Sequence, residues 1–149
     1  MRLSPVVAAL AALAIAPPVV ADPSLDDRRD ASMLPLDRPT EIGGVRLACT
    51  GVGEARTDPR WQGYAVRIEV SNARGEYLAG EQVTLRDIRG RELFTVACDD
   101  PWVLADLAPG RYVVEARLQG HPDLSPSTTT IRVPPRGQVR IVLQFPEAD

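Results

Sequence analysis

Short stretches in which apolar and polar residues alternate, separated by Gly and Pro, constrain the fold of this chain more than any other feature. The alternation is clear in residues 66–71, 82–86, 112–118 and 139–145, and a turn signal at residues 72–75 closes the first of them. A period of two places the apolar side chains on one face of a β-strand. No long stretch has the period of a helix, so the sequence predicts an all-β domain: a sandwich of seven or eight antiparallel strands.

The order of these stretches indicates which strands lie together. Residues 66–71 and 82–86 follow one another in the sequence and are expected to be neighbouring strands. Residues 93–98 form a more continuous apolar run, which is typical of a strand buried on both sides. Cys98 is therefore expected at the end of a strand.

One short helix is predicted after the first strand. Thr57 or Asp58 would cap it, Pro59 would take the first helical position, and the helix would end near Tyr64. Trp61 and Tyr64 are three residues apart, so one face of this turn would lie on the sandwich.

The first 21 residues have the pattern of a cleaved signal peptide. Arg2 precedes an apolar stretch at residues 6–16, and small residues lead to Ala21, after which cleavage is expected. The apolar stretch is shorter than the roughly 20 residues that a membrane span needs. The sequence therefore predicts a periplasmic or secreted protein that does not span the membrane.

Residues 22–42 contain three prolines and many charges without a regular period, and they are predicted to form a flexible N-terminal arm. The alternative is that Met33, Leu34 and Leu36 dock on the domain as an irregular strand. The folded domain is expected to span residues 43–146.

The two cysteines, Cys49 and Cys98, are expected to form a disulfide. Export would take them to an oxidising compartment, where pairing is the default. Both are expected at strand ends, and a sandwich can bring two such ends together. Two buried free thiols are the alternative, and two Cys with one distant His do not complete a zinc site.

Two segments carry a resemblance to a known family. Residues 80–87 (GEQVTLRD), Gly90 and residues 107–114 (LAPGRYVV) resemble the carboxypeptidase regulatory-like domain. Residues 49–54 (CTGVGE) and 100–102 (DPW) are similar to its exported bacterial branch, which usually has Gly where this chain has Asp100. The resemblance implies a transthyretin-like (prealbumin-like) β-sandwich, and it implies a structural or binding role because its motifs are turn and core residues.

The sequence offers no set of catalytic residues. His121 is the only histidine, and no nucleophile motif accompanies it. The related hydroxyisourate hydrolases end in Tyr-Arg-Gly-Ser, whereas this chain does not. Asp99 and Asp100, with Asp106, are too few ligands to predict a calcium site. We therefore expect a protein that is not an enzyme and has no metal or cofactor.

Four aromatic residues are the candidates for a binding surface: Trp61, Tyr64, Tyr77 and Trp102. Exposed on a sandwich, they could form a platform for sugar rings or for a protein. The alternative is that Trp61 and Trp102 fill the two ends of the core. A third possibility is strand addition, in which an extended peptide pairs with a free sheet edge.

The formal net charge is −3, and all the cationic side chains are arginines scattered among acidic residues. This distribution argues against nucleic acid as a partner. The main hypothesis is an exported structural or protein-binding module whose partner is another exported protein or a cell-envelope component. The alternative hypothesis is a glycan-binding module that uses the four aromatic residues.

Overall fold

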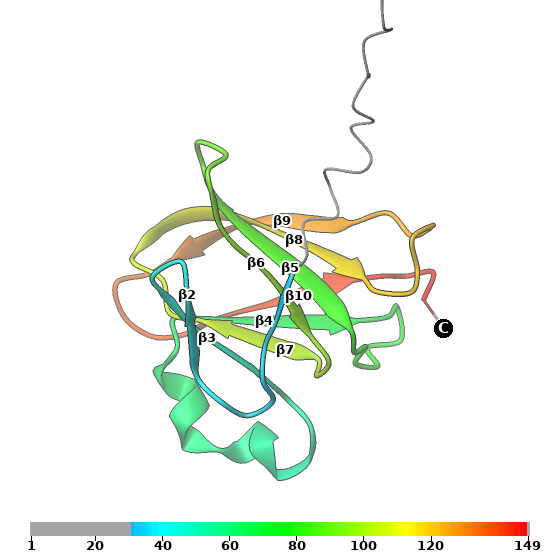
Figure 1. Cartoon of the computed structure of the whole chain (residues 1–149), viewed down its shortest axis with the longest axis horizontal. Helices are drawn as coiled ribbons and strands as arrows, with labels where there is room; N and C mark the ends of the chain where they lie inside the picture. The colour runs from blue at the N-terminus through cyan, green and yellow to red at the C-terminus, as the bar shows by residue number, and fades with distance from the viewer. Residues whose placement is uncertain (1–30, 149) are drawn as a thin grey trace, which may run out of the picture.

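The alternating stretches form strands in a computed structural model that describes residues 31–148. These residues form ten strands in two five-stranded sheets that pack face to face as a β-sandwich (Figure 1). The predicted signal peptide, residues 1–21, lies outside the described residues, and so do residues 22–30 of the predicted arm.

We call the two layers sheet A and sheet B. In spatial order, sheet A consists of β1 (Ser32–Met33), β6 (Glu92–Cys98), β5 (Glu81–Asp87), β8 (Gly110–Leu118) and β9 (Ser127–Val133). Sheet B consists of β10 (Val139–Gln144), β4 (Val66–Ser71), β7 (Trp102–Ala105), β3 (Val45–Thr50) and β2 (Thr40–Ile42).

The all-β sandwich is confirmed, but the details of strand number and direction differ from the prediction. Both sheets are mixed, because β10 runs parallel to β4 and β1 runs parallel to β6. The prediction that residues 66–71 and 82–86 are neighbouring strands is wrong, since β4 lies in sheet B and β5 in sheet A. Alternation reports which face of a strand is buried and says nothing about its partner or their relative direction.

The described part of the predicted flexible arm is paired with the domain. Ser32 and Met33 pair with β6, and residues 40–42 pair with β3. The side chain of Leu34 is buried, at 2% exposure, while Met33 and Leu36 remain about half exposed. Residues 31–42 therefore do not form a free arm, because strand pairing and the burial of Leu34 hold them on the sandwich.

Two 3₁₀ helices occupy the segment where one short helix was predicted. They are η1 (Gly53–Thr57) and η2 (Pro59–Gly63). Asp58 caps η2 by accepting a hydrogen bond from the main-chain N–H of Arg60, and Pro59 takes the first helical position. Figure 1 shows both helices on the side of sheet B that faces away from sheet A.

The main core lies between the two sheets. The apolar positions of each strand point inward, for example Val66, Ile68 and Val70 of β4 and Val83 and Leu85 of β5, which are all fully buried. A second, smaller cluster lies on the outer side of sheet B, where η2 covers it. Its members are Ala48, Trp61, Tyr64 and Leu104.

Candidate functional site

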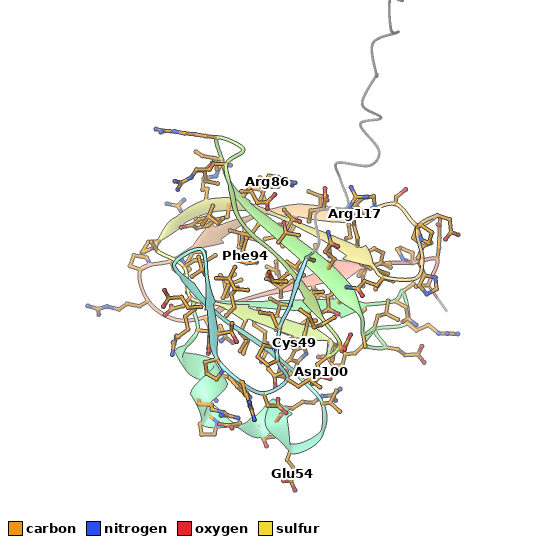
Figure 2. All side chains as sticks on the ribbon, viewed as in Figure 1. Cys49, Glu54, Arg86, Phe94, Asp100 and Arg117 are labelled. Atoms are coloured by element: carbon orange, nitrogen blue, oxygen red, sulfur yellow. A yellow bond between two sulfur atoms is a disulfide. The ribbon has the colours of Figure 1, made fainter. Side chains whose placement is uncertain are left out.

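A disulfide between Cys49 and Cys98 joins the two sheets, as predicted. Cys49 lies in β3 of sheet B and Cys98 ends β6 of sheet A, with 5.6 Å between their Cα atoms. Neither residue has any exposed surface, and both belong to the main core between the sheets (Cys49 is labelled in Figure 2). The bond therefore locks the packing of the sandwich and is not placed to react with solutes.

Three of the four candidate aromatic residues are buried. Trp61, Tyr64 and Trp102 are only 2–5% exposed, whereas Tyr77 is 36% exposed. Trp61 and Tyr64 pack on the outer side of sheet B within the smaller apolar cluster. The prediction of an exposed platform for sugar rings is therefore wrong for these three residues, because their ring faces are used inside the protein.

Each of the four aromatic rings also has an arginine guanidinium stacked on one face. These contacts are cation–π interactions, in which the ring quadrupole attracts the charge. No spacing in the sequence signals these contacts, because three of the four pairs join residues far apart in the chain. The distances from guanidinium carbon to ring centre are 4.4 Å for Arg46 on Tyr64, 4.8 Å for Arg56 on Tyr77, 4.2 Å for Arg60 on Trp61 and 4.5 Å for Arg67 on Trp102.

Gly51 allows Trp102 to pack flat against the chain after β3. A Cβ atom on Gly51 would lie 2.7 Å from the indole ring, and its φ of +118° is one that other residues rarely adopt. The main-chain oxygen of Gly51 accepts a hydrogen bond of 2.6 Å from Arg56 Nε. The CTGVGE segment (residues 49–54) therefore has a packing role, in line with the expectation that its residues serve as turn and core residues.

Glu69 is the centre of a charged cluster on the outer side of sheet B. Its side chain is fully buried, and Arg140 donates to its two oxygens at 2.7 and 2.6 Å. Tyr77 Oη donates to the same carboxylate at 3.1 Å, and Arg67 Nε lies 2.8 Å from it. Hydrogen bonds to Glu69 and Tyr77 raise the pKa of Arg140. The carboxylate is saturated with donors and is not free to act as a general acid or base.

Glu81 is the second fully buried glutamate, and it lies on the inner side of sheet A. It is paired in register with Cys98, so the two side chains are cross-strand neighbours beside the disulfide. Neither carboxyl oxygen has a hydrogen-bond partner in the described part of the chain. The pKa of Glu81 is raised to about 9, mainly by burial; its own N–H acts in the opposite direction, and the nearby Asp100 and Asp99 add to the rise. Glu81 is therefore a neutral acid at pH 7.

The outer face of sheet A differs from that of sheet B because the arginines and threonines of β8 and β9 on this face are open to solvent. Arg111 and Arg132 are exposed and lie directly opposite one another on β8 and β9, and Arg86 of β5 is paired with Val113, two residues along β8 from Arg111. None of these three arginine side chains has a hydrogen bond or ion pair with any described residue, and sequence reasoning did not single them out. Figure 2 shows Arg86 and Arg117 on this sheet.

β9 is an edge strand of sheet A that pairs only with β8, and a groove lies beside its first residues. The groove has a volume of about 350 Å³ and is formed by residues 124–128 and 144–147. Leu124 and Phe145 contribute apolar surface to it. The groove thus lies where the edge strands of the two sheets, β9 and β10, come together.

The residues considered for catalysis or calcium are not assembled into a site. His121 is exposed in the turn after β8, and its main-chain N–H donates to Leu118. Asp100 precedes β7, whereas Asp106 follows it and pairs with Arg46 at 3.3 Å. Within residues 31–148, no three His, Cys, Asp or Glu side chains are grouped so that they could hold a metal ion.

No protein-family model matches the chain, and no curated protein matches it. Among the described residues, no helix is long and apolar enough to cross a membrane.

Proposed function

We propose that this chain is an exported, non-enzymatic β-sandwich module that binds another exported protein through the outer side of sheet A. The observation that carries the proposal is the contrast between the two outer faces. On sheet B, the chain covers its own surface and pairs the buried carboxylate of Glu69 with arginines. On sheet A, Arg86, Arg111 and Arg132 have no partner in the described chain, so they are available to another molecule.

The proposal of export rests on the signal-peptide pattern and on the disulfide. A bond that joins the two sheets in the core needs an oxidising compartment to form. Cell fractionation and N-terminal sequencing test this part of the proposal. We expect a periplasmic or secreted protein that begins at Asp22, and a cytoplasmic protein that retains Met1 would contradict it.

We also propose that the domain is of the transthyretin-like, carboxypeptidase regulatory-like type. The contacts of the LAPGRYVV segment support a structural use of that motif. Tyr112 Oη donates a 2.7 Å hydrogen bond to the main-chain oxygen of Ala108, and Leu107 is buried in the core. A tyrosine that bonds back to the preceding turn fixes the entry into β8, as the tyrosine corner does in other sandwiches.

Photo-crosslinking in the native host tests the binding role. A photoreactive residue replaces Val113, in the middle of the outer face of sheet A, or Gln62, which is exposed on η2 beside sheet B. We expect a protein adduct from Val113 and none from Gln62. Adducts from Gln62 alone, or no adduct from Val113 under conditions in which the protein is exported and folded, would contradict the proposal.

A further inference from the structure

The two edges of sheet A differ in whether a further segment of the chain pairs with the long strand there. At one edge, β1 adds to β6 and pairs with Val96 and Ala97. At the other edge, β9 pairs only with β8, and no described strand or loop bonds to its outer side. β9 is seven residues long, so alternate N–H and C=O groups along it are free to pair with another extended chain.

Two positive charges lie at the Val133 end of this edge. Arg132 lies on β9 and Arg111 lies opposite it on β8. Like charges that are directly opposite destabilise a sheet, and no acidic side chain in the described residues pairs with either arginine. In a chain with a net charge of −3, this pair leaves a local excess of positive charge next to a free strand edge.

The groove lies at the other end of the same edge, beside Ser127 and Thr128. It opens between β9 and β10, which places it on the inner side of sheet A, whereas Arg132 points to the outer side. Side chains of an added strand alternate between these two sides. One such strand could therefore place acidic side chains beside the arginines and an apolar side chain in the groove.

We propose that β9 accepts an extended, acidic segment of another exported polypeptide as a sixth, antiparallel strand of sheet A. This inference rests on the proposed function and specifies its partner. The added strand runs from the Arg132 end of β9 toward Ser127. Carboxylates of the added strand contact Arg111 and Arg132 on the outer side of the sheet. An apolar side chain of the same strand enters the groove on the inner side, three or five residues after a carboxylate, because residues an odd number of positions apart point to opposite sides of a sheet.

A synthetic peptide of nine residues provides the probe. Thr and Val alternate in it, except for Glu at positions 2 and 4 and Leu at position 7, and both ends are blocked. Nuclear magnetic resonance of the isotope-labelled mature protein measures where it binds. We expect amide shifts in β9 and β8 at millimolar peptide, together with contacts between the peptide backbone and β9. Absence of shifts, or shifts confined to other strands, would overturn the proposal.

Three changes separate strand addition from simple charge attraction. The double variant R111S/R132S should weaken peptide binding about tenfold, since each exposed ion pair contributes modestly. Methylating the peptide nitrogens that face β9 should abolish binding, because the added strand loses its hydrogen-bond donors. Moving Leu to position 6 should weaken binding because the side chain then points away from the groove.

The control is R117S, which removes one positive charge from the same face of β8. Arg117 already pairs with Glu115 at 3.1 Å, so this variant should bind the peptide within about twofold of the wild type. Equal losses in R117S and R111S/R132S would overturn the proposal. So would tight binding of oligogalacturonate, an acidic sugar polymer without main-chain N–H groups, with the same dependence on Arg111 and Arg132.

The crosslinking and peptide experiments fail in different ways. A protein adduct from Val113 that persists in R111S/R132S, combined with no peptide binding at β9, leaves the proposed function standing and overturns the acidic strand. Absence of any adduct from Val113 overturns the proposed function itself.

Discussion

The two outer faces of the sandwich use arginine in opposite ways. On sheet B, Arg67 and Arg140 hold the buried Glu69, and four arginines cover aromatic rings. On sheet A, Arg111 and Arg132 face each other in solvent and contact no acidic group of the described chain. An arginine-rich surface can therefore stabilise the fold or be available to a partner. The two roles are distinguished by whether the guanidinium groups contact carboxylates and aromatic rings of the same chain.

The two buried glutamates show the same contrast within the protein. Glu69 in sheet B has three donors or cations around its carboxylate, whereas Glu81 in sheet A has no partner for its oxygens among the described residues. Removing one partner of a buried ion pair destabilises the fold, because the other charge is left buried without a partner. A buried acid without a partner stays neutral in the folded protein, and the cost of keeping it protonated lowers the free energy of unfolding as pH rises. The following variants test these assignments, from the largest expected effect to the smallest.

Removing the disulfide that connects the two sheets should have the largest effect. The double variant C49A/C98A should lower the free energy of unfolding by about 4 kcal/mol, because the bond closes a long loop in the unfolded chain and the sequence separation is 49 residues. Urea denaturation of the oxidised wild type and the variant measures it. A loss below about 1 kcal/mol would show that the sheets do not depend on the covalent link.

Removing Glu69 should destabilise the protein by about 3 kcal/mol, since Arg67 is left beside a desolvated gap and Arg140 loses its two hydrogen bonds. The matched control is E115A on sheet A, which breaks the pair with Arg117 on the open face. Its loss should stay below about 1 kcal/mol. Equal losses for E69A and E115A in urea denaturation would remove the distinction between the two faces.

Replacing Glu81 with Gln should stabilise the protein by about 2–3 kcal/mol at pH 6.5. The unfolded carboxyl loses its proton near pH 4.5, while the folded carboxyl keeps it until about pH 9. Between these values the unfolded state binds fewer protons, so the wild type loses about 1.4 kcal/mol per pH unit from this group as pH rises. Gln cannot ionise, so the E81Q advantage should disappear at pH 4 and grow from pH 5 to 8. An advantage that does not change with pH would contradict this assignment.

The smallest expected effect on stability is that of R111S/R132S. Neither side chain has a partner in the described chain, so the free energy of unfolding should change by less than about 0.5 kcal/mol. Relief of the repulsion between the two charges could make the change slightly favourable. A loss above about 1 kcal/mol would show that these arginines support the fold, and it would weaken the argument that they serve a partner.

The sequence predicted the sandwich and the disulfide because both depend on local pattern and compartment. The alternation of Val66, Ile68 and Val70 marked the inner face of β4, and Cys98 ended an apolar run. The polar residues of β4 lie on the opposite face, and Glu69 is fully buried there. Its cover comes from segments distant in sequence, which alternation cannot reveal.

The candidate site was less predictable because the exposure and the partners of its side chains depend on contacts between segments that are separated in the sequence. Trp61 and Trp102 were candidates for an exposed platform, but η2 and the segment around Gly51 bury them. Arg111 and Arg132 were read only as scattered charges. Their importance follows from register, which places them opposite each other at an edge strand, and apolar–polar alternation alone does not give the register between two strands.

Hydrogen exchange in a partner complex tests the central claim most directly. The complex is the adduct recovered from the host with the photoreactive residue at Val113, compared with the same protein before crosslinking. We predict slower exchange of β9 amides that are free in the uncomplexed domain, with no change in residues 53–63 beside sheet B. Protection of residues 53–63 with β9 unchanged would contradict the account, because it would place the partner on the face that the chain already covers.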